Sequence, residues 1–290
     1  MRALITGASG QLGSALLRHA PPQAELRALT RQQLDIRDAD AVRATVGSFR
    51  PQLIVNAAAY TAVDKAESEP ELAAAINVEG ARHLAAAARS LDDCRLLQVS
   101  TDYVFDGRSA APYQPDDPTH PLSVYGRTKL AGEQAALGLL ADRAVVLRTA
   151  WVYAAHGRNF LLTILRLMRE RGTVRVVADQ KGTPTAAASI ARALWRIADL
   201  PTVHGVLHWT DDGVASWYEF AGAIAEQALA AGLLSQPVEV TPISSADYPT
   251  PAHRPANSVL DISAAVAQLG VRPEHWRVNL QATLAELSRR

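Results

Sequence analysis

Near its start the chain reads Ala3-Leu4-Ile5-Thr6-Gly7-Ala8-Ser9-Gly10-Gln11-Leu12-Gly13. An apolar strand pattern runs into glycines spaced G-x-x-G-x-x-G, where a helical pattern begins. Glycines at these places let the turn tighten and the backbone approach a pyrophosphate, which the N-terminus of the helix attracts through its free N–H groups and its dipole. An ordinary strand-to-helix turn can carry such glycines too, but their position directly after an apolar strand favours dinucleotide binding.

Outward from this motif, short apolar runs alternate with amphipathic helical patterns. The apolar runs cover 3–6, 26–29, 53–56, 96–100 and 144–148, and the first three are followed by helical patterns over 12–19, 39–49 and 71–88. Nearly continuous Leu, Val and Ala runs suit parallel strands that are covered by helices on both faces. We therefore predict an α/β fold, with a Rossmann-type doubly wound parallel sheet over residues 1–150.

The rhythm changes after Trp151. A helix is predicted over 159–170, a strand over 174–178, and Pro- and Gly-rich connections over 180–184 and 248–255. We expect residues 151–290 to form mainly a smaller C-terminal substrate-binding lobe. The two parts should be interleaved, because the pattern at 205–209, within a segment near 186–220, is typical of a strand that returns to the main sheet.

Composition narrows the function classes. The 290 residues carry 29 basic and 29 acidic side chains, so the zero net charge draws the protein neither to nucleic acid nor to an anionic membrane. Cys94 is the lone cysteine, no charged-then-apolar leader precedes the first strand, and no apolar run reaches the roughly 18 residues that cross a bilayer. We expect a cytoplasmic protein, and no metal, because the histidines lack metal-ligand spacing.

The second strand ends at Thr30 and Arg31, where folds selective for NAD usually present an acid to the ribose 2′-hydroxyl. Arg31 can pair with the 2′-phosphate of NADP or be a solvated surface charge. NADPH is therefore favoured as the cofactor, with NADH as a second acceptable one. Asp38 suits the N-cap of the helix from residue 39, which leaves Asp35 and Ile36 to flank the adenine.

Small side chains in Asn56-Ala57-Ala58-Ala59 permit a ligand to approach the end of the third strand, or permit tight helix packing instead. The expected cofactor contacts are Gly7, Ser9, Gly10, Gln11, Leu12, Gly13, Thr30, Arg31, Asp35, Ile36, Ala58, Ala59, Tyr60, Thr61, Val99, Tyr125 and Lys129.

A proton donor is predicted in the segment Tyr125-Gly126-Arg127-Thr128-Lys129, which opens a helical pattern. Side chains four residues apart share one helix face, and a nearby ammonium favours the ionised form of a phenol and so lowers its pKa. Thr101 ends the fourth strand, at the edge of the sheet where such folds bind ligands. Tyr-x-x-x-Lys alone also fits an amphipathic helix start, but with Thr101 and the glycine motif it predicts a catalytic triad of Thr101, Tyr125 and Lys129.

These features, in this order, resemble the extended short-chain dehydrogenase/reductase family. Four further segments, 100–107, 148–153, 179–185 and 254–258, together with 56–67, are similar to the dTDP-4-dehydrorhamnose reductase family. The resemblance spans nearly the whole chain. It implies NAD(P)H-dependent reduction of the 4-keto group of dTDP-4-dehydro-β-L-rhamnose to dTDP-β-L-rhamnose, with Tyr125 as proton donor, Lys129 as its modulator and ribose ligand, and Thr101 as polarising group.

The expected substrate contacts are Thr101, Asp102, Tyr103, Trp151, Arg254 and Asn257. Trp151 offers a flat face to a 6-deoxysugar or fills the core, and Arg254 offers a bidentate donor to the diphosphate. Gln180, Thr183 and Thr185 are secondary candidates, with Thr185 also a plausible N-cap, and Asn77 is either near the site or a buried structural amide.

A dehydratase of this family would carry Asp-Glu after the threonine, whereas Tyr103 follows Asp102, so elimination of water is disfavoured. Asp102 itself suits either an acid or a local turn.

Two alternatives stay open at this point. Reduction or epimerisation of another nucleotide-linked ketosugar uses the same apparatus. A non-catalytic regulatory subunit would not need Thr101, Tyr125 and Lys129. The sequence leaves a monomer and a homodimer equally open.

Overall fold

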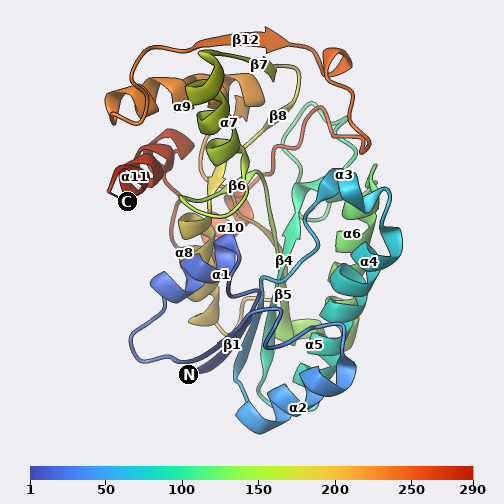
Figure 1. Ribbon diagram of the computed structural model, residues 1–290. Coiled ribbons are helices and arrows are strands. Elements are labelled where there is room, and N and C mark those ends of the chain that lie inside the picture. The colour runs from blue at the N-terminus through green and yellow to red at the C-terminus, as the bar shows by residue number, and fades with distance from the viewer. Residues whose placement is uncertain (290) are drawn as a thin grey trace.

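The computed structural model describes residues 1–289, and its centre is a six-stranded sheet in the order β10-β5-β4-β3-β1-β2 (Figure 1). All neighbouring strands run parallel. The strands are β1 (Arg2–Thr6), β2 (Glu25–Leu29), β3 (Leu53–Asn56), β4 (Arg95–Thr101), β5 (Ala144–Thr149) and β10 (Gly205–His208). The predicted Rossmann-type sheet is thereby confirmed. Its order reverses at β1, so the carboxyl ends of β1 and β3 form the crevice where such sheets bind ligands.

Helices cover both faces of the sheet (Figure 1). One face carries α1 (Gln11–Arg18), α8 (Ala187–Ala198) and α10 (Ser263–Leu269); the other carries α2 (Ala39–Phe49), α5 (Gly80–Arg89) and α6 (Val124–Leu140). Strand side chains alternate between the two cores: Ala3 and Ile5 pack with α1 and α8, whereas Leu4 packs with α2 and α5. Because both faces are buried, every strand position from 3 to 6 is apolar or hydrogen-bonded.

A second core lies above the carboxyl ends of the strands in Figure 1. It is built from α7 (Phe160–Arg171), α9 (Trp217–Ala230), α11 (Trp276–Ser288) and the parallel pair β7 (Thr173–Val177) and β12 (Glu239–Ile243). Two short pairs link it to the sheet: β6 (Val152–Tyr153) with β9 (Thr185–Ala186), and β8 (Lys181–Gly182) with β11 (Ala215–Ser216). The strand expected at 205–209 is β10, which extends the main sheet beside β5.

The helix expected over 71–88 is not continuous. After α3 (Val63–Ala66), the chain forms α4 (Pro70–Ala74), a π-helical turn over Ala75–Glu79, and then α5. The bulge lies against Gly132 of α6, where a Cβ atom would approach the Asn77 carbonyl oxygen to 2.2 Å. π-Turns of this kind often occur at functional sites.

Two capping predictions had different outcomes. Asp38 caps α2 as expected, since its carboxylate accepts hydrogen bonds from the backbone N–H groups of Asp40 and Ala41. The N-cap role of Thr185 is wrong: β9 continues through Ala186, so that α8 begins at Ala187 with Ala186 at its N-cap, and the Thr185 hydroxyl donates to the Thr183 carbonyl instead.

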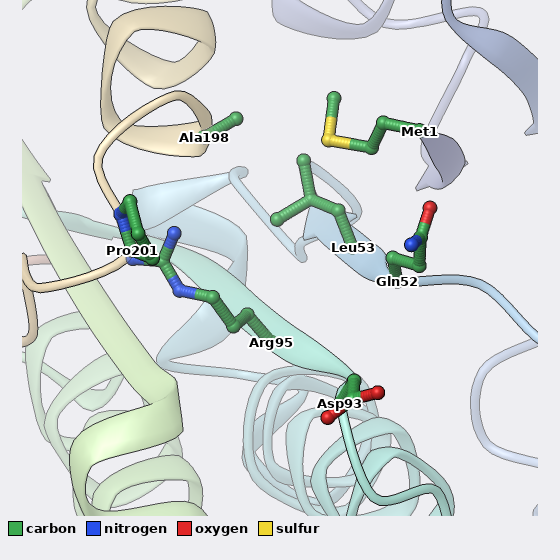
Figure 2. A pocket seen from close by; sticks show the side chains of 7 residues that line it. All are labelled: Met1, Gln52, Leu53, Asp93, Arg95, Ala198 and Pro201. Carbon is green, nitrogen blue, oxygen red and sulfur yellow. The ribbon is translucent and has the colours of Figure 1, made fainter.

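The amino edge of the sheet has a hollow of about 330 Å³, lined by Met1, Gln52, Leu53, Asp93, Arg95, Ala198 and Pro201 (Figure 2). Figure 2 shows Arg95 reaching toward Pro201, and its guanidinium donates to the carbonyls of Ile197 (3.2 Å) and Val203 (2.6 Å). These bonds tie β4 to the last turn of α8 and to the loop that follows it. The hollow thus lies at the end of the sheet opposite the glycine motif. Within residues 1–289, no helix has the length and apolar character to span a membrane.

Candidate active site

The glycine motif forms a turn that only glycines can make. Gly7 has a φ of +68°, and a Cβ there would lie 2.7 Å from the Ala58 nitrogen. At Gly13, a Cβ would lie 2.2 Å from the Gly7 carbonyl oxygen. Gly10 is the N-cap of α1 without any side-chain cap, and no acidic residue lies in the first turn of that helix. The N-terminus of α1 can therefore accept a pyrophosphate.

Other expected residues of this motif have distinct surroundings. Ser9 is exposed beside the turn, whereas Leu12 is buried in the core beneath it. Gln11 accepts a hydrogen bond from Asn159 Nδ2 (2.7 Å), and Asn159 caps α7. Gln11 thereby connects the glycine turn to the second core.

The end of β2 is polar and positively charged at its surface. Thr30 donates from its nitrogen to Gln33 Oε1 (2.9 Å), and Arg31 is exposed. Asp35 pairs with Arg37 at 2.5 Å, and hydrogen bonds from Arg37 hold the pKa of this carboxyl below its usual value. Asp35, the acid that follows β2, is therefore already paired with Arg37. Ile36, which was expected beside the adenine, packs its side chain against Gly80 of α5.

Asn77 braces the loop that follows β3. Its Oδ1 accepts from the Tyr60 nitrogen (2.9 Å), and its Nδ2 donates to the Tyr60 carbonyl (3.2 Å) and to Thr128 Oγ1 on α6 (3.0 Å). Ala58 at the start of the loop donates from its nitrogen to Asn56 Oδ1 (3.2 Å). Ala59 is half-buried and Thr61 exposed. Asn77 is therefore both a buried amide and a brace between this loop and α6.

The structure brings Thr101, Tyr125 and Lys129 together. Ser123 caps α6 through the Gly126 nitrogen (3.1 Å), so that Tyr125 and Lys129 point from the first turns of the helix toward β4. Lys129 Nζ donates to the Val99 carbonyl (2.6 Å), and burial lowers the pKa of Lys129 to about 8. Burial raises the pKa of Tyr125 to about 12, while a hydrogen bond with Thr101 opposes this rise. The expected lowering of the Tyr125 pKa by Lys129 is therefore wrong: burial raises this pKa, and the group that opposes the rise is Thr101.

Asp102 is a buried carboxylate beside this group. Its Oδ1 accepts from Thr101 Oγ1 (3.0 Å), and its Oδ2 is buried. Burial raises the pKa of Asp102 to about 6. The ring of Tyr103 meets that of Tyr125 edge to face, with centroids 5.7 Å apart. Hydrogen bonding by the side chains of Ser258 and Thr101 opposes the rise in the Asp102 pKa.

The side chains of the remaining expected substrate residues contact other residues of the protein. Trp151, with φ +48°, stacks on Trp217 with ring centroids 3.4 Å apart, and Gly182 lies against its ring. Arg254 pairs with Asp64 at 2.8 Å, which keeps the pKa of that carboxyl low. Asn257 donates to the Ser109 carbonyl (2.8 Å).

Gln180 Nε2 donates to Ser245 Oγ (2.9 Å), its Oε1 accepts from Trp217 Nε1 (3.2 Å), and Thr183 is buried. Gln180 therefore holds Trp217, the stacking partner of Trp151, through a hydrogen bond.

Sequence reasoning missed four residues in this region: Asp64, Glu133, Arg148 and Trp217. Glu133 had a signal, since it follows Lys129 by four residues and so shares its helix face. The others meet their partners only across long sequence separations. Among residues 1–289, no three His, Cys, Asp or Glu side chains are grouped to hold a metal ion.

Comparisons with known proteins agree with this geometry. The family described as "RmlD substrate binding domain" matches residues 1–289. The dTDP-4-dehydrorhamnose reductase of Aggregatibacter actinomycetemcomitans is 43% identical, covering 95% of this chain and 96% of that protein. A probable dTDP-4,6-dihydroxy-2-methyloxan-3-one 4-ketoreductase of Streptomyces antibioticus is 44% identical, over 90% and 86% of the two chains.

A solved structure is similar as well. That of dTDP-4-dehydrorhamnose reductase from Bacillus anthracis, in complex with NADP, has a TM-score of 0.92 and 34% identity, covering 98% of this chain and 99% of that one. The match of fold, length and sequence extends over both cores, so the chain belongs to the RmlD substrate binding domain family.

Proposed function

We propose that this protein reduces the 4-keto group of dTDP-4-dehydro-β-L-rhamnose to dTDP-β-L-rhamnose with NADPH. The observation that carries this proposal is the meeting of Thr101, Tyr125 and Lys129 at the carboxyl edge of the sheet whose crevice holds the glycine turn. Similarity to reductases named for this reaction supports it.

The glycine turn fits a dinucleotide because it is tight. A Cβ at Gly7 or Gly13 would clash with neighbouring backbone atoms, so only glycine permits the close turn that leads a pyrophosphate to the N-terminus of α1. When bound, the reduced nicotinamide supplies the hydride that adds to carbon 4. Tyr125 then gives its hydroxyl proton to the forming alkoxide, and Thr101, whose hydroxyl must turn from Asp102 Oδ1, donates a hydrogen bond to the same oxygen. Lys129, held by the Val99 carbonyl, binds the nicotinamide ribose and favours the tyrosinate that remains.

NADPH is the proposed cofactor, with NADH a weaker alternative. Arg31 is exposed at the end of β2, and Asp35 is already paired with Arg37, so no free acid meets the ribose 2′-hydroxyl. The Bacillus anthracis relative was solved with NADP. Both observations favour a 2′-phosphate.

On the substrate side, we assign Asp102, Tyr103 and Trp151 to the sugar and Arg254 to the diphosphate, with Asn257 as a support of the same segment. Residues 1–150 would hold the cofactor and 151–290 mainly the substrate, and biosynthesis of this kind fits a cytoplasmic enzyme. A second candidate is reduction of another nucleotide-linked 4-ketosugar, favoured by the Streptomyces antibioticus relative.

The test is NADPH oxidation with dTDP-4-dehydrorhamnose and, in parallel, with other dTDP-4-ketosugars. Tyr125→Phe should bind NADPH like the wild type and lose turnover by about 100-fold or more. Preference for another ketosugar would replace the substrate assignment, and full activity of Tyr125→Phe would remove the tyrosine from the mechanism.

A further inference from the structure

Three side chains at four-residue spacing face β4 from α6: Tyr125, Lys129 and Glu133. Together they contact three neighbouring residues at the end of β4. Tyr125 bonds with Thr101, Lys129 Nζ donates to the Val99 carbonyl at 2.6 Å, and Ser100 Oγ donates to Glu133 Oε1. On the strand, the contact of Glu133 therefore lies between the two contacts that belong to the candidate active site.

Glu133 is fixed more firmly than either neighbour. It is 2% exposed and accepts from Arg148 of β5 through Nε (3.0 and 3.2 Å) and Nη2 (2.8 Å). Arg148, itself 4% exposed, also donates to the Pro115 carbonyl (3.1 Å) and lies over the Phe105 ring. Helix α6, strands β4 and β5 and the loop after β4 thus all meet at this carboxylate.

A buried ion pair is a costly way to stabilise a fold, since removing both charges from water offsets most of their attraction. Apolar residues of similar volume would pack here as they do along the rest of β5, where Val145, Val146 and Leu147 are fully buried. The position of the pair, one helical turn below Lys129, indicates a role in the site.

We propose that Glu133 is a positioning residue: it fixes the register of α6 on β4 and presents a negative charge to Lys129. The inference rests on the proposed function, because it gives Lys129 a role in the reaction. With Glu133 in place, the ammonium stays protonated although it is buried, and Tyr125 stays opposite Thr101.

The charges around Lys129 support this role. Glu133 lies one turn after Lys129 on α6 and Tyr125 one turn before it, Asp102 follows β4, Arg148 lies on β5 and His208 on β10. Burial lowers the pKa of Lys129 to about 8, and Glu133 is the group that opposes this fall. Removing the carboxylate alone would leave Arg148 as an unbalanced cation and lower the Lys129 pKa further.

The experiment compares Glu133→Gln with the wild type by two readouts. Lys65, Lys129 and Lys181 are the lysines of the chain, so NMR of isotopically labelled lysine can titrate Lys129 directly, with the other two as internal references. We expect its pKa to fall by about one unit. The alkaline limb of the kcat profile should move to lower pH by the same amount.

Glu170→Gln is the matched control, because Glu170 pairs with Arg166 on the exposed face of α7 (3.0 Å) and should change neither readout. If Glu133→Gln fails to fold, the double variant Glu133→Leu/Arg148→Met removes both charges together and should still show a lowered Lys129 pKa.

An unchanged Lys129 pKa and pH profile, with only a lower melting temperature, would show that the pair is purely structural and overturn the inference. The titration needs no turnover. A wild type that binds NADPH but reduces no sugar would therefore contradict the proposed function, whereas the NMR titration of Lys129 would still test this inference.

Discussion

Gly132→Ala should destabilise the protein, although alanine is ordinarily the better helix residue. Gly132 lies inside α6, and a Cβ there would be 2.2 Å from the Asn77 carbonyl and 3.5 Å from the Ala81 Cβ. Gly138, on the same helix, has nothing within 4 Å of its Cβ position. The intrinsic gain of about 0.5–1 kcal/mol from glycine to alanine applies to both sites. Only Gly132→Ala adds an overpacking cost, about 1–3 kcal/mol.

The difference between the two variants isolates that packing cost, because the helix propensity cancels. Urea unfolding should give Gly138→Ala a higher free energy of unfolding than the wild type, and Gly132→Ala a free energy about 1–3 kcal/mol below that of Gly138→Ala. Gly132→Ala should also weaken NADPH binding, since the π-turn carries the Asn77 brace on Tyr60. Equal free energies for the two variants would refute the close contact between α6 and this turn.

Three further outcomes follow from the site. Arg31→Ala should weaken NADPH binding about tenfold and leave NADH binding unchanged, as measured by fluorescence titration; equal losses for both cofactors would remove Arg31 from the 2′-phosphate. Burial, then Arg148, lowers the pKa of His208 to about 3. Between pH 6.5 and about 3 the unfolded chain therefore binds one proton more than the folded protein, and stability is lost as the pH falls through this range. The melting temperature of His208→Gln should fall less steeply with decreasing pH than that of the wild type, and parallel curves for the two proteins would contradict this. Trp217→Ala removes the stacking partner of Trp151 and should raise the KM for the nucleotide sugar but not for NADPH; an unchanged sugar KM would exclude the stack from the substrate site.

Local patterns carried the predictions that hold. The glycine turn, the strands of the main sheet and the Asp38 cap depend on residues within a few positions of one another, which periodicity and capping chemistry describe well. That Tyr125 and Lys129 lie on one helix could likewise be predicted, because their four-residue spacing is local.

Contacts between distant segments were beyond sequence reasoning. The π-turn at Asn77 depends on Gly132, some fifty positions later, and Arg254 finds Asp64 at a separation of 190. The direction of the Tyr125 pKa depended on burial by surrounding elements, and Lys129 is not among the groups that shift it. Thr185 has the side chain of an N-cap, but the pairing of β9 with β6 continues through Ala186, so that α8 begins only at Ala187.

The central claim is that this site transfers a hydride to a sugar ketone. The most direct test uses NADPH carrying deuterium at the transferred position of the nicotinamide, with dTDP-4-dehydrorhamnose as substrate and mass spectrometry and NMR of the sugar product. We predict that cofactor oxidation matches product formation and that deuterium is retained at carbon 4 of dTDP-rhamnose. Conversion of the sugar without deuterium uptake or net NADPH loss would contradict the claim and indicate epimerisation instead.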